Sequence, residues 1–178
     1  MQRILPAEFE PATKKRLEEL WGTPPHMYRC LANHPKLVAA WAEFARVIRY
    51  ESRTPRELRE LLILRGAQLM GSEYEWAHHL AMARKAGVRE AQIAALAGWR
   101  TSGEFDEREK AALALAEAVT HGKVSDDVYA EARRHFDPQD FVELSLTAAF
   151  YAMVGRLLDA MGVQLEPESR DYSPKLPA

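Results

Sequence analysis

Hydrophobic residues recur along most of the chain at the three- and four-residue spacing of amphipathic helices. Residues 61–64, within the stretch 57–70, are apolar on every side, and residues 141–161 are largely apolar, which is typical of helices buried in a core. No stretch shows the alternation of β-branched residues between turns that indicates a strand. The pattern therefore predicts an all-α fold. After Pro35, one helix face carries Leu37, Val38, Trp41, Phe44, Ala45 and Ile48.

Proline, glycine and capping residues divide this pattern into separate helices. A short turn is expected over residues 27–33, between the first two helices. Three capping boxes mark helix starts: Thr54-x-x-Glu57, Ser72-x-x-Glu75 and Asp106-x-x-Glu109. The predicted helices begin near Pro11, at Pro35 and at Pro55, and then cover residues 73–86, 89–97, 106–121, 126–136 and 138–161.

The length of 178 residues fits one domain with a single core, which we expect over residues 1–163. Residues 164–178 contain three prolines and no periodicity, so they are predicted to form an extended arm. The two apolar helices offer more hydrophobic surface than one small core covers. A homo-oligomer associating through apolar helices is therefore expected.

Composition excludes several classes of protein. The net charge is −2 and the basic residues are dispersed, which argues against a nucleic-acid partner. Acidic residues come too early in the chain for a secretory signal, and the apolar stretches are judged too short for a bilayer, which needs roughly 20 residues. A cytoplasmic protein without a membrane partner is expected. The single cysteine, Cys30, forms no internal disulfide, and its apolar setting favours a buried core residue over a peroxidatic thiol.

Several polar residues that could take part in a reaction lie close to Gly71 in the sequence. Glu75 and His79 are four residues apart and share a helix face, whereas His78 lies about 100° around the helix from His79. Glu60 sits in an apolar helix, where a carboxylate is costly unless it is paired, and where burial raises its pKa. A Glu–His–Glu cluster is a proton-transfer device, with His79 as base or acid.

Structural explanations compete with each of these roles. Ser72 and Glu75 are accounted for by their capping box, and His78 by a surface or interface position. Three N/O ligands from Glu60, Glu75 and His79 would be enough for a catalytic metal, but no metal-ligand motif is present, so no metal is predicted.

Two further residues are predicted to bind substrate. The planar guanidinium of Arg156 could bind a substrate carboxylate through two hydrogen bonds. An ion pair with Asp159 is the competing explanation for an arginine at this position. Trp76 lies within the His-bearing run, but its spacing also fits a core or interface residue.

The stretch RELRELLILRGAQLMGSEYEWAHHLAMARKAG, residues 56–87, resembles the central segment of the carboxymuconolactone decarboxylase family, the AhpD-like proteins. Flanking segments, LANHPKLVAAWAEF before it and GVREAQIAALA and GRLLDAMGVQLEP after it, are similar to the same family. The resemblance implies a multi-helix bundle that assembles as trimers or trimers of dimers. It also implies a small-molecule substrate and, in the decarboxylase branch, a cofactor-free role in aromatic compound catabolism.

In the redox branch of that family, a Glu precedes a CxxC pair and a His follows the second Cys by four residues. The resemblance places these positions on Glu60, Ser72, Glu75 and His79, so both cysteines are replaced. It therefore implies a thiol-free lyase with His79, Glu75 and Glu60 as catalytic residues and His78, Ser72, Trp76 and Arg156 at the substrate. The alternatives are a peroxiredoxin-like activity that depends on Cys30, and a non-enzymatic oligomer that binds a small ligand.

Overall fold

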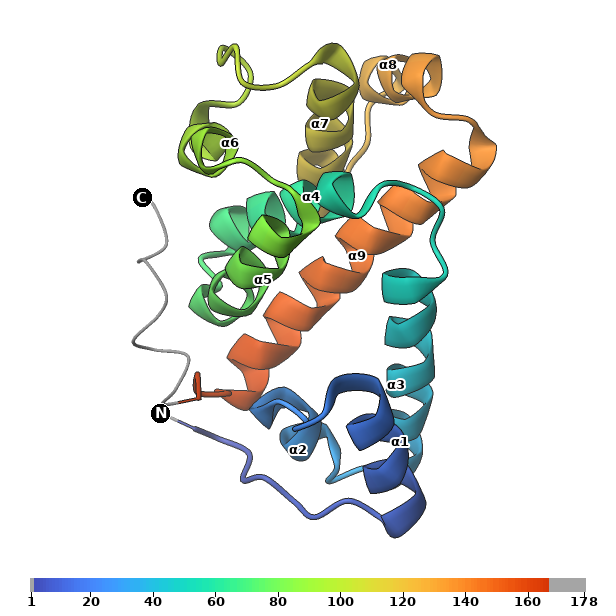
Figure 1. Cartoon of the computed structure of the whole chain (residues 1–178), viewed down its shortest axis with the longest axis vertical. Helices are drawn as coiled ribbons and strands as arrows, with labels where there is room; N and C mark the ends of the chain where they lie inside the picture. Colours follow the sequence, from blue (N-terminus) through green and yellow to red (C-terminus); the bar gives the residue numbers. More distant parts are fainter. Residues whose placement is uncertain (1, 167–178) are drawn as a thin grey trace. The chain divides into compact units, whose positions relative to one another are not determined.

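The computed structural model describes residues 2–166, and over this range the regular secondary structure is helical, with no strand (Figure 1). The all-α prediction is therefore confirmed. The helices are, in order, α1 (Pro11–Trp21), α2 (His26–Leu31), α3 (Pro35–Tyr50), α4 (Arg56–Met70), α5 (Glu73–Ala86), α6 (Glu90–Ala95), the 3-10 helix η1 (Leu96–Gly98), α7 (Glu107–His121), α8 (Asp126–His135) and α9 (Pro138–Met161).

The described residues form two compact units. The first contains residues 2–52 and 156–166, and the second contains Arg53–Gly155. Helix α9 is continuous and contributes to both units. The expected single domain over residues 1–163 stays a prediction, since the two units share this helix. Most of the predicted arm lies outside the described residues.

In the first unit, α1 and α2 pack on α3. Leu17 from α1 and Val38 from α3 are buried there, and the rings of Trp21 and Tyr28 lie 4.8 Å apart. Glu166 accepts a 2.7 Å hydrogen bond from the His26 N–H and so caps the first turn of α2. Residues 26–31 thus form a helix where the sequence predicted a turn, because a carboxylate distant in the sequence binds its first amide.

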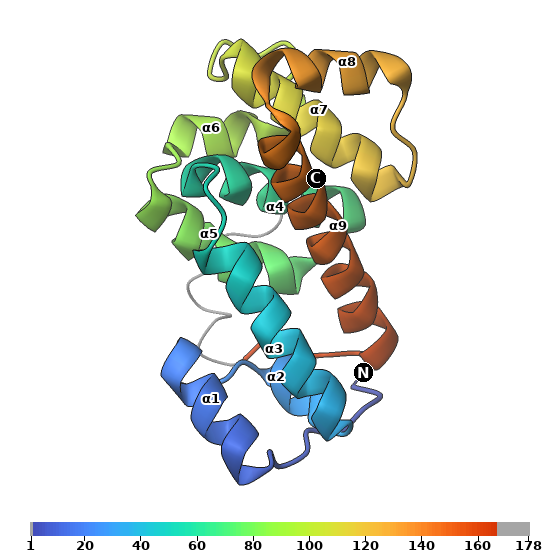
Figure 2. The ribbon, with the colours of Figure 1, turned by 90° about the vertical axis from the view of Figure 1, so that its right-hand side faces the viewer.

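In the second unit, α4 is the central helix and packs against both α5 and α7 (Figures 1 and 2). One face, with Leu61 and Leu64, belongs to a core cluster that includes Trp76 from α5. Another face, with Leu58 and Leu62, belongs to a cluster with residues of α7, α8 and α9. Residues 61–64 of α4 are apolar and buried on every side, as the sequence predicted for a central helix.

The start of α4 differs from the prediction. Pro55 is the N-cap residue, and no side-chain capping bond forms at this end, so the Thr54-x-x-Glu57 box is absent. Glu143 on α9 accepts hydrogen bonds from the backbone N–H groups of Arg53 (3.2 Å) and Thr54 (2.9 Å) instead. The other two predicted caps are present, since Ser72 and Asp106 accept bonds from the backbone N–H groups of Glu75 and Glu109.

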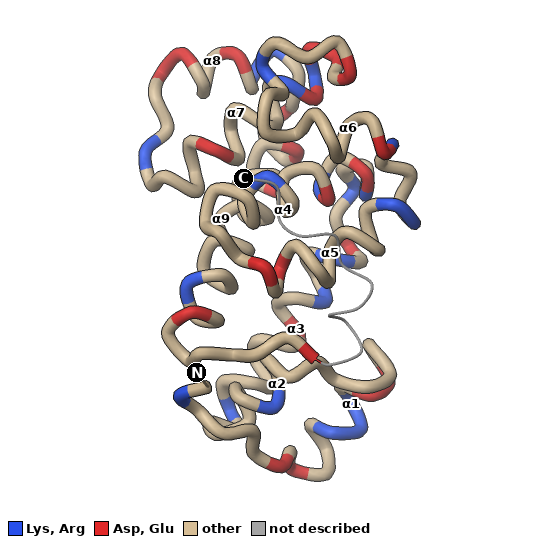
Figure 3. The backbone as a smooth tube through the Cα atoms, turned by 90° about the vertical axis from the view of Figure 1, so that its left-hand side faces the viewer, with Lys and Arg blue, Asp and Glu red and all other residues tan. Residues whose placement is uncertain are grey.

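Helix α9 corrects the statement that every apolar stretch is too short for a bilayer. Its 24 residues are long and apolar enough to cross a membrane by length and composition alone. Half of its most apolar window is buried inside the protein, however, which is also expected of the core helix of a folded domain. Lys, Arg, Asp and Glu are interspersed along the described backbone (Figure 3).

Candidate functional site

The side chains of Glu60, Glu75 and His79 meet inside the second unit. Gly71 ends α4 with a φ of 62°, in the left-handed region that suits glycine. Ser72 then caps α5 by accepting a 3.4 Å hydrogen bond from the N–H of Glu75. This tight turn returns α5 alongside α4, so the predicted approach of Glu60 to the His-bearing face of α5 is confirmed.

Glu60 and His79 form a buried pair. Glu60 Oε2 lies 2.8 Å from His79 Nδ1, and the two side chains are 0% and 2% exposed. The other carboxylate oxygen, Oε1, forms an ion pair with Arg56, one turn earlier on α4. The Glu60 carboxylate therefore contacts the guanidinium of Arg56 with one oxygen and the imidazole of His79 with the other.

The environment of Glu60 corrects the expectation that burial raises its pKa. Burial does act to raise the pKa of the Glu60 carboxyl, but the charges and hydrogen bonds of His79 and Arg56 outweigh it, so the pKa is lowered. Glu60 is therefore ionised near neutral pH. An ionised carboxylate only accepts hydrogen bonds, which places a proton on Nδ1 of His79.

The second ring nitrogen of His79 faces Glu75. Nε2 lies 3.8 Å from Glu75 Oε2, close enough for strong electrostatic coupling but too long for a hydrogen bond. The Glu75 side chain is 5% exposed and lies in the first turn of α5, where the helix dipole favours a negative charge. His79 thus has a carboxylate on each side of its ring.

Tyr151 on α9 is a member of this group that sequence reasoning missed. Its ring lies 4.7 Å from the His79 ring, centroid to centroid, in an edge-on geometry of 83°, and it is 3% exposed. The only signal in the sequence was a phenolic hydroxyl within an apolar helix. Nothing local indicated which helix that ring would contact.

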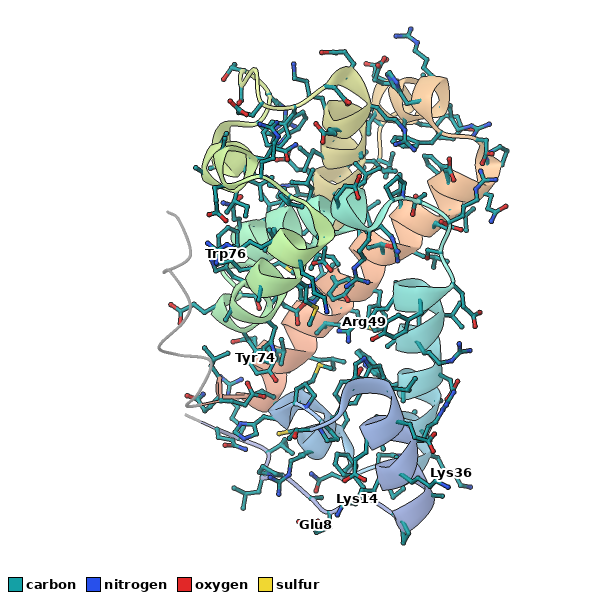
Figure 4. The ribbon with its side chains drawn as sticks, in the orientation of Figure 1. Glu8, Lys14, Lys36, Arg49, Tyr74 and Trp76 are labelled. Atoms are coloured by element: carbon teal, nitrogen blue, oxygen red, sulfur yellow. The ribbon has the colours of Figure 1, made fainter. Side chains whose placement is uncertain are left out.

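The four residues predicted to bind substrate do not lie together in one environment. Ser72 caps α5, and His78 is half-buried with its ring 4.5 Å from that of Tyr74. Trp76, on the same helix as Tyr74 (Figure 4), is 2% exposed and packs in the core. Arg156 is exposed on the part of α9 that belongs to the first unit. Roles in substrate binding for these four residues stay predictions.

Two alternatives can be compared with this geometry. Within residues 2–166, no group of three or more His, Cys, Asp or Glu side chains is arranged to hold a metal ion. Cys30 lies in the first unit and is 2% exposed, and burial raises the pKa of its thiol. A peroxidatic cysteine requires the opposite shift, because the thiolate is the nucleophile.

The comparisons with known proteins identify the family of the chain. A family model described as the carboxymuconolactone decarboxylase family matches residues 35–118. An uncharacterised Bacillus subtilis (strain 168) protein, YdfG, is 33% identical over 115 residues, which are 63% of this chain and 78% of YdfG. The chain belongs to the carboxymuconolactone decarboxylase family. The matched region of this family member contains Glu60, Glu75 and His79 but ends before Tyr151.

Solved structures share the fold of this carboxymuconolactone decarboxylase family member. The debrominase Bmp8 in complex with 2,3,4-tribromopyrrole is 22% identical, with a TM-score of 0.82 over 94% of each chain. A peroxidase-related protein from Silicibacter sp. TM1040 is 17% identical, with a TM-score of 0.80 over 94% of this chain and 93% of that one. The alkylhydroperoxidase AhpD core protein from Ralstonia eutropha JMP134 is 18% identical, with a TM-score of 0.80 over 94% of each chain. The AhpD-like helical fold is therefore confirmed.

Proposed function

We propose that this protein is a cofactor-free acid–base enzyme, a lyase that acts on a small lactone or carboxylic acid, with His79 as the proton-transferring residue. The observation that carries the proposal is the buried hydrogen bond between Glu60 Oε2 and His79 Nδ1. An ionised carboxylate at Nδ1 fixes the tautomer of an imidazole and stabilises its protonated form. The other ring nitrogen, Nε2, faces Glu75 and is the proposed proton-transferring atom.

In a decarboxylation, the bond between the substrate carbon and its carboxylate breaks and CO2 leaves. The electron pair stays on the carbon framework, and the protonated His79 delivers a proton from Nε2 to that carbon. Glu75 then passes a proton from solvent back to Nε2. Each turnover consumes one solvent proton and returns His79 and Glu75 to their starting states.

The charge distribution supports this assignment of roles. Arg56 and His79 together lower the pKa of Glu60, so Glu60 remains an anion throughout and orients the imidazole without giving up a proton. Glu75 lies at the opposite nitrogen and is the candidate relay. A small cyclic substrate is in keeping with the tribromopyrrole bound by Bmp8, which shares the fold.

The test is an ultraviolet turnover assay on carboxymuconolactone, related lactones and β-keto acids, with and without a chelator. Replacing His79 by Ala or Glu75 by Gln should lower turnover by about 10²–10⁴-fold, the usual contribution of a positioned acid or base. The matched control is His121→Ala, because His121 is an exposed histidine at the end of α7. Full turnover in the His79→Ala protein would refute the proposal.

Association of identical chains is a further part of this proposal. On α9, Val142, Leu146 and Met153 lie on one face at helical spacing and are 54%, 43% and 39% exposed. Such an apolar face is a candidate contact between copies of the chain. Light scattering coupled to gel filtration would detect a trimer or a hexamer, and a monomer at micromolar concentration would contradict it.

A further inference from the structure

The N-terminal segment, residues 2–7, lies against the C-terminal end of α9. The backbone N–H groups of Arg3 and Ile4 both donate to the carbonyl oxygen of Met161, at 3.0 and 3.1 Å. Met161 is the last residue of α9, and the carbonyl groups of a last helical turn have no N–H partners within the helix. The segment therefore supplies hydrogen bonds that this helix end cannot make for itself.

The side chain of Arg3 adds a charge to this contact. Its Nη1 atom donates to the carbonyl oxygens of Asp159 (2.8 Å) and Ala160 (3.3 Å), in the same last turn of α9. The C-terminal end of a helix carries a partial negative charge, so a cation is favourable there. Because Arg3 is exposed, salt screens this attraction.

The other end of the segment is attached to α2 and the residues that follow it. The N–H of Ala7 donates to the carbonyl oxygen of Arg29, and Asn33 Nδ2 donates to the carbonyl oxygen of Leu5, both at 2.9 Å. The large apolar side chains of the segment add little to the core, since Ile4 is 40% and Leu5 is 76% exposed. A segment with few buried apolar contacts opens at a lower free energy than the whole protein unfolds.

Cys30 on α2 is in contact with this segment. Its thiol donates to the carbonyl oxygen of Ile4 over 3.6 Å, and Gln2 Nε2 donates to Cys30 Sγ over 3.9 Å. The cysteine is only 2% exposed. The segment is thus part of the cover between the thiol and the solvent, and the reactivity of the thiol reports whether that cover is in place.

We propose that residues 2–7 are a strap that opens as one unit while the rest of the protein stays folded, with Arg3 at the end of α9 as its main attachment. Opening removes the cover from Cys30 and leaves the last carbonyl groups of α9 to water. The inference is independent of the proposed function, because these contacts lie in the first unit and His79 lies in the second. Cys30 is the reporter of opening and receives no catalytic role.

The test follows the alkylation of Cys30 by iodoacetamide over hours, by mass spectrometry, in a series of urea concentrations below the unfolding transition. The free energy of an opening falls with urea in proportion to the surface that the opening exposes. The strap exposes little surface, so we expect a labelling rate that is nearly independent of urea. A rate that rises throughout with the full slope of global unfolding would overturn the inference, because Cys30 would then be exposed only by complete unfolding.

Arg3→Ala tests the attachment of the strap. We expect labelling to become about fivefold faster at low urea, the effect of removing a cation from a helix C-terminus, while the rate stays nearly independent of urea. Added sodium chloride should speed labelling of the wild type but not of Arg3→Ala. The matched control is Arg134→Ala, since Arg134 is an exposed arginine of the second unit that forms an ion pair with Glu131. Equal labelling of wild type and Arg3→Ala would overturn the role of Arg3.

Hydrogen exchange measured by NMR gives a second, independent readout. The amides of Arg3, Ile4 and Ala7 should share one protection factor, because they are released by the same opening. That protection should be far below the protection of Ala45, a fully buried residue in the middle of α3. Protection of the three amides equal to that of Ala45, or differing more than about tenfold among them, would show that the segment does not open as one separate unit.

Discussion

Glu60 Oε2 and His79 Nδ1 lie 2.8 Å apart inside the second unit, although 19 residues separate them along the chain. The tight turn at Gly71 makes this contact possible because it brings the middle of α5 beside the middle of α4. Arg56 on the other oxygen of Glu60 keeps this carboxylate ionised in a buried setting. The pair is thus a preformed imidazole–carboxylate unit whose second ring nitrogen, Nε2, faces Glu75.

Replacing Glu60 by Gln should destabilise the protein by about 3 kcal/mol, because it leaves the Arg56 charge without its buried partner. The lowered pKa of Glu60 also gives a pH dependence. A carboxyl whose folded pKa is depressed contributes stability above its unfolded pKa and loses it as the pH falls through the folded value. Wild-type stability should therefore decline below about pH 4.5, the ordinary value for Glu, and this part of the decline should vanish in Glu60→Gln.

Urea unfolding between pH 3 and 8 measures both effects. Glu57→Gln is the matched control, since Glu57 lies on the same helix but is exposed. Equal pH dependence in wild type and Glu60→Gln would show that Glu60 is not held ionised by the folded state.

Glu143→Ala should destabilise the protein by about 1–2 kcal/mol, whereas Glu57→Ala should have an effect below about 0.5 kcal/mol. The reason is that Glu143 binds the backbone N–H groups of Arg53 and Thr54 before α4, while the expected capping box with Glu57 is absent. Thermal unfolding of the two variants measures the difference. A larger loss in Glu57→Ala would indicate that the local capping box forms in solution.

Cys30 should be unreactive toward a thiol reagent such as DTNB in the folded protein at pH 7 and should react fully once the protein is unfolded. Its side chain is 2% exposed, and burial raises the pKa of the thiol, so little thiolate is present. Absorbance of the released thionitrobenzoate follows the reaction. Cys30→Ser should keep lactone turnover. Rapid labelling of native protein, with peroxide consumption that is lost in Cys30→Ser, would favour the peroxiredoxin-like alternative instead.

Glu117→Ala should destabilise the second unit by about 3–5 kcal/mol. This buried carboxylate on α7 accepts hydrogen bonds from Arg65 Nε (2.6 Å) and Trp99 Nε1 (2.8 Å) and forms an ion pair with Arg100. Its removal leaves a buried indole N–H without its acceptor. Chemical unfolding monitored by tryptophan fluorescence measures the loss, and the exposed Glu107 on the same helix, replaced by Ala, is the control.

The helices could largely be predicted from the sequence because their ends depend on nearby residues. Helix α5 covers residues 73–86 and α9 covers residues 138–161, as the glycine, proline and capping patterns indicated. The capping box of Asp106 and Glu109 also forms as predicted. In each case, the deciding interaction is a backbone conformation or a hydrogen bond within a few residues, which a sequence pattern records directly.

The exceptions have partners that are distant in the sequence. Residues 26–31 form a helix because Glu166 binds its first amide, and α4 starts without its own capping box because Glu143 binds the preceding amides. A local pattern contains no information about these carboxylates. The two predictions therefore failed for the same physical reason, since a backbone N–H without a local acceptor donates its hydrogen bond to whichever carboxylate the fold brings to it.

The features of the candidate site also fall into two groups, those set by nearby residues and those set by contacts distant in the sequence. The sequence by itself determined that Glu75 and His79 share a face of α5, since their spacing of four residues is a property of any helix. Only the tertiary structure decided that Glu60 binds Nδ1, that Arg56 and His79 lower its pKa against the effect of burial, and that the ring of Tyr151 meets His79. These relationships depend on the packing of α4, α5 and α9, and helix packing is set by the whole core and not by the spacing within one helix.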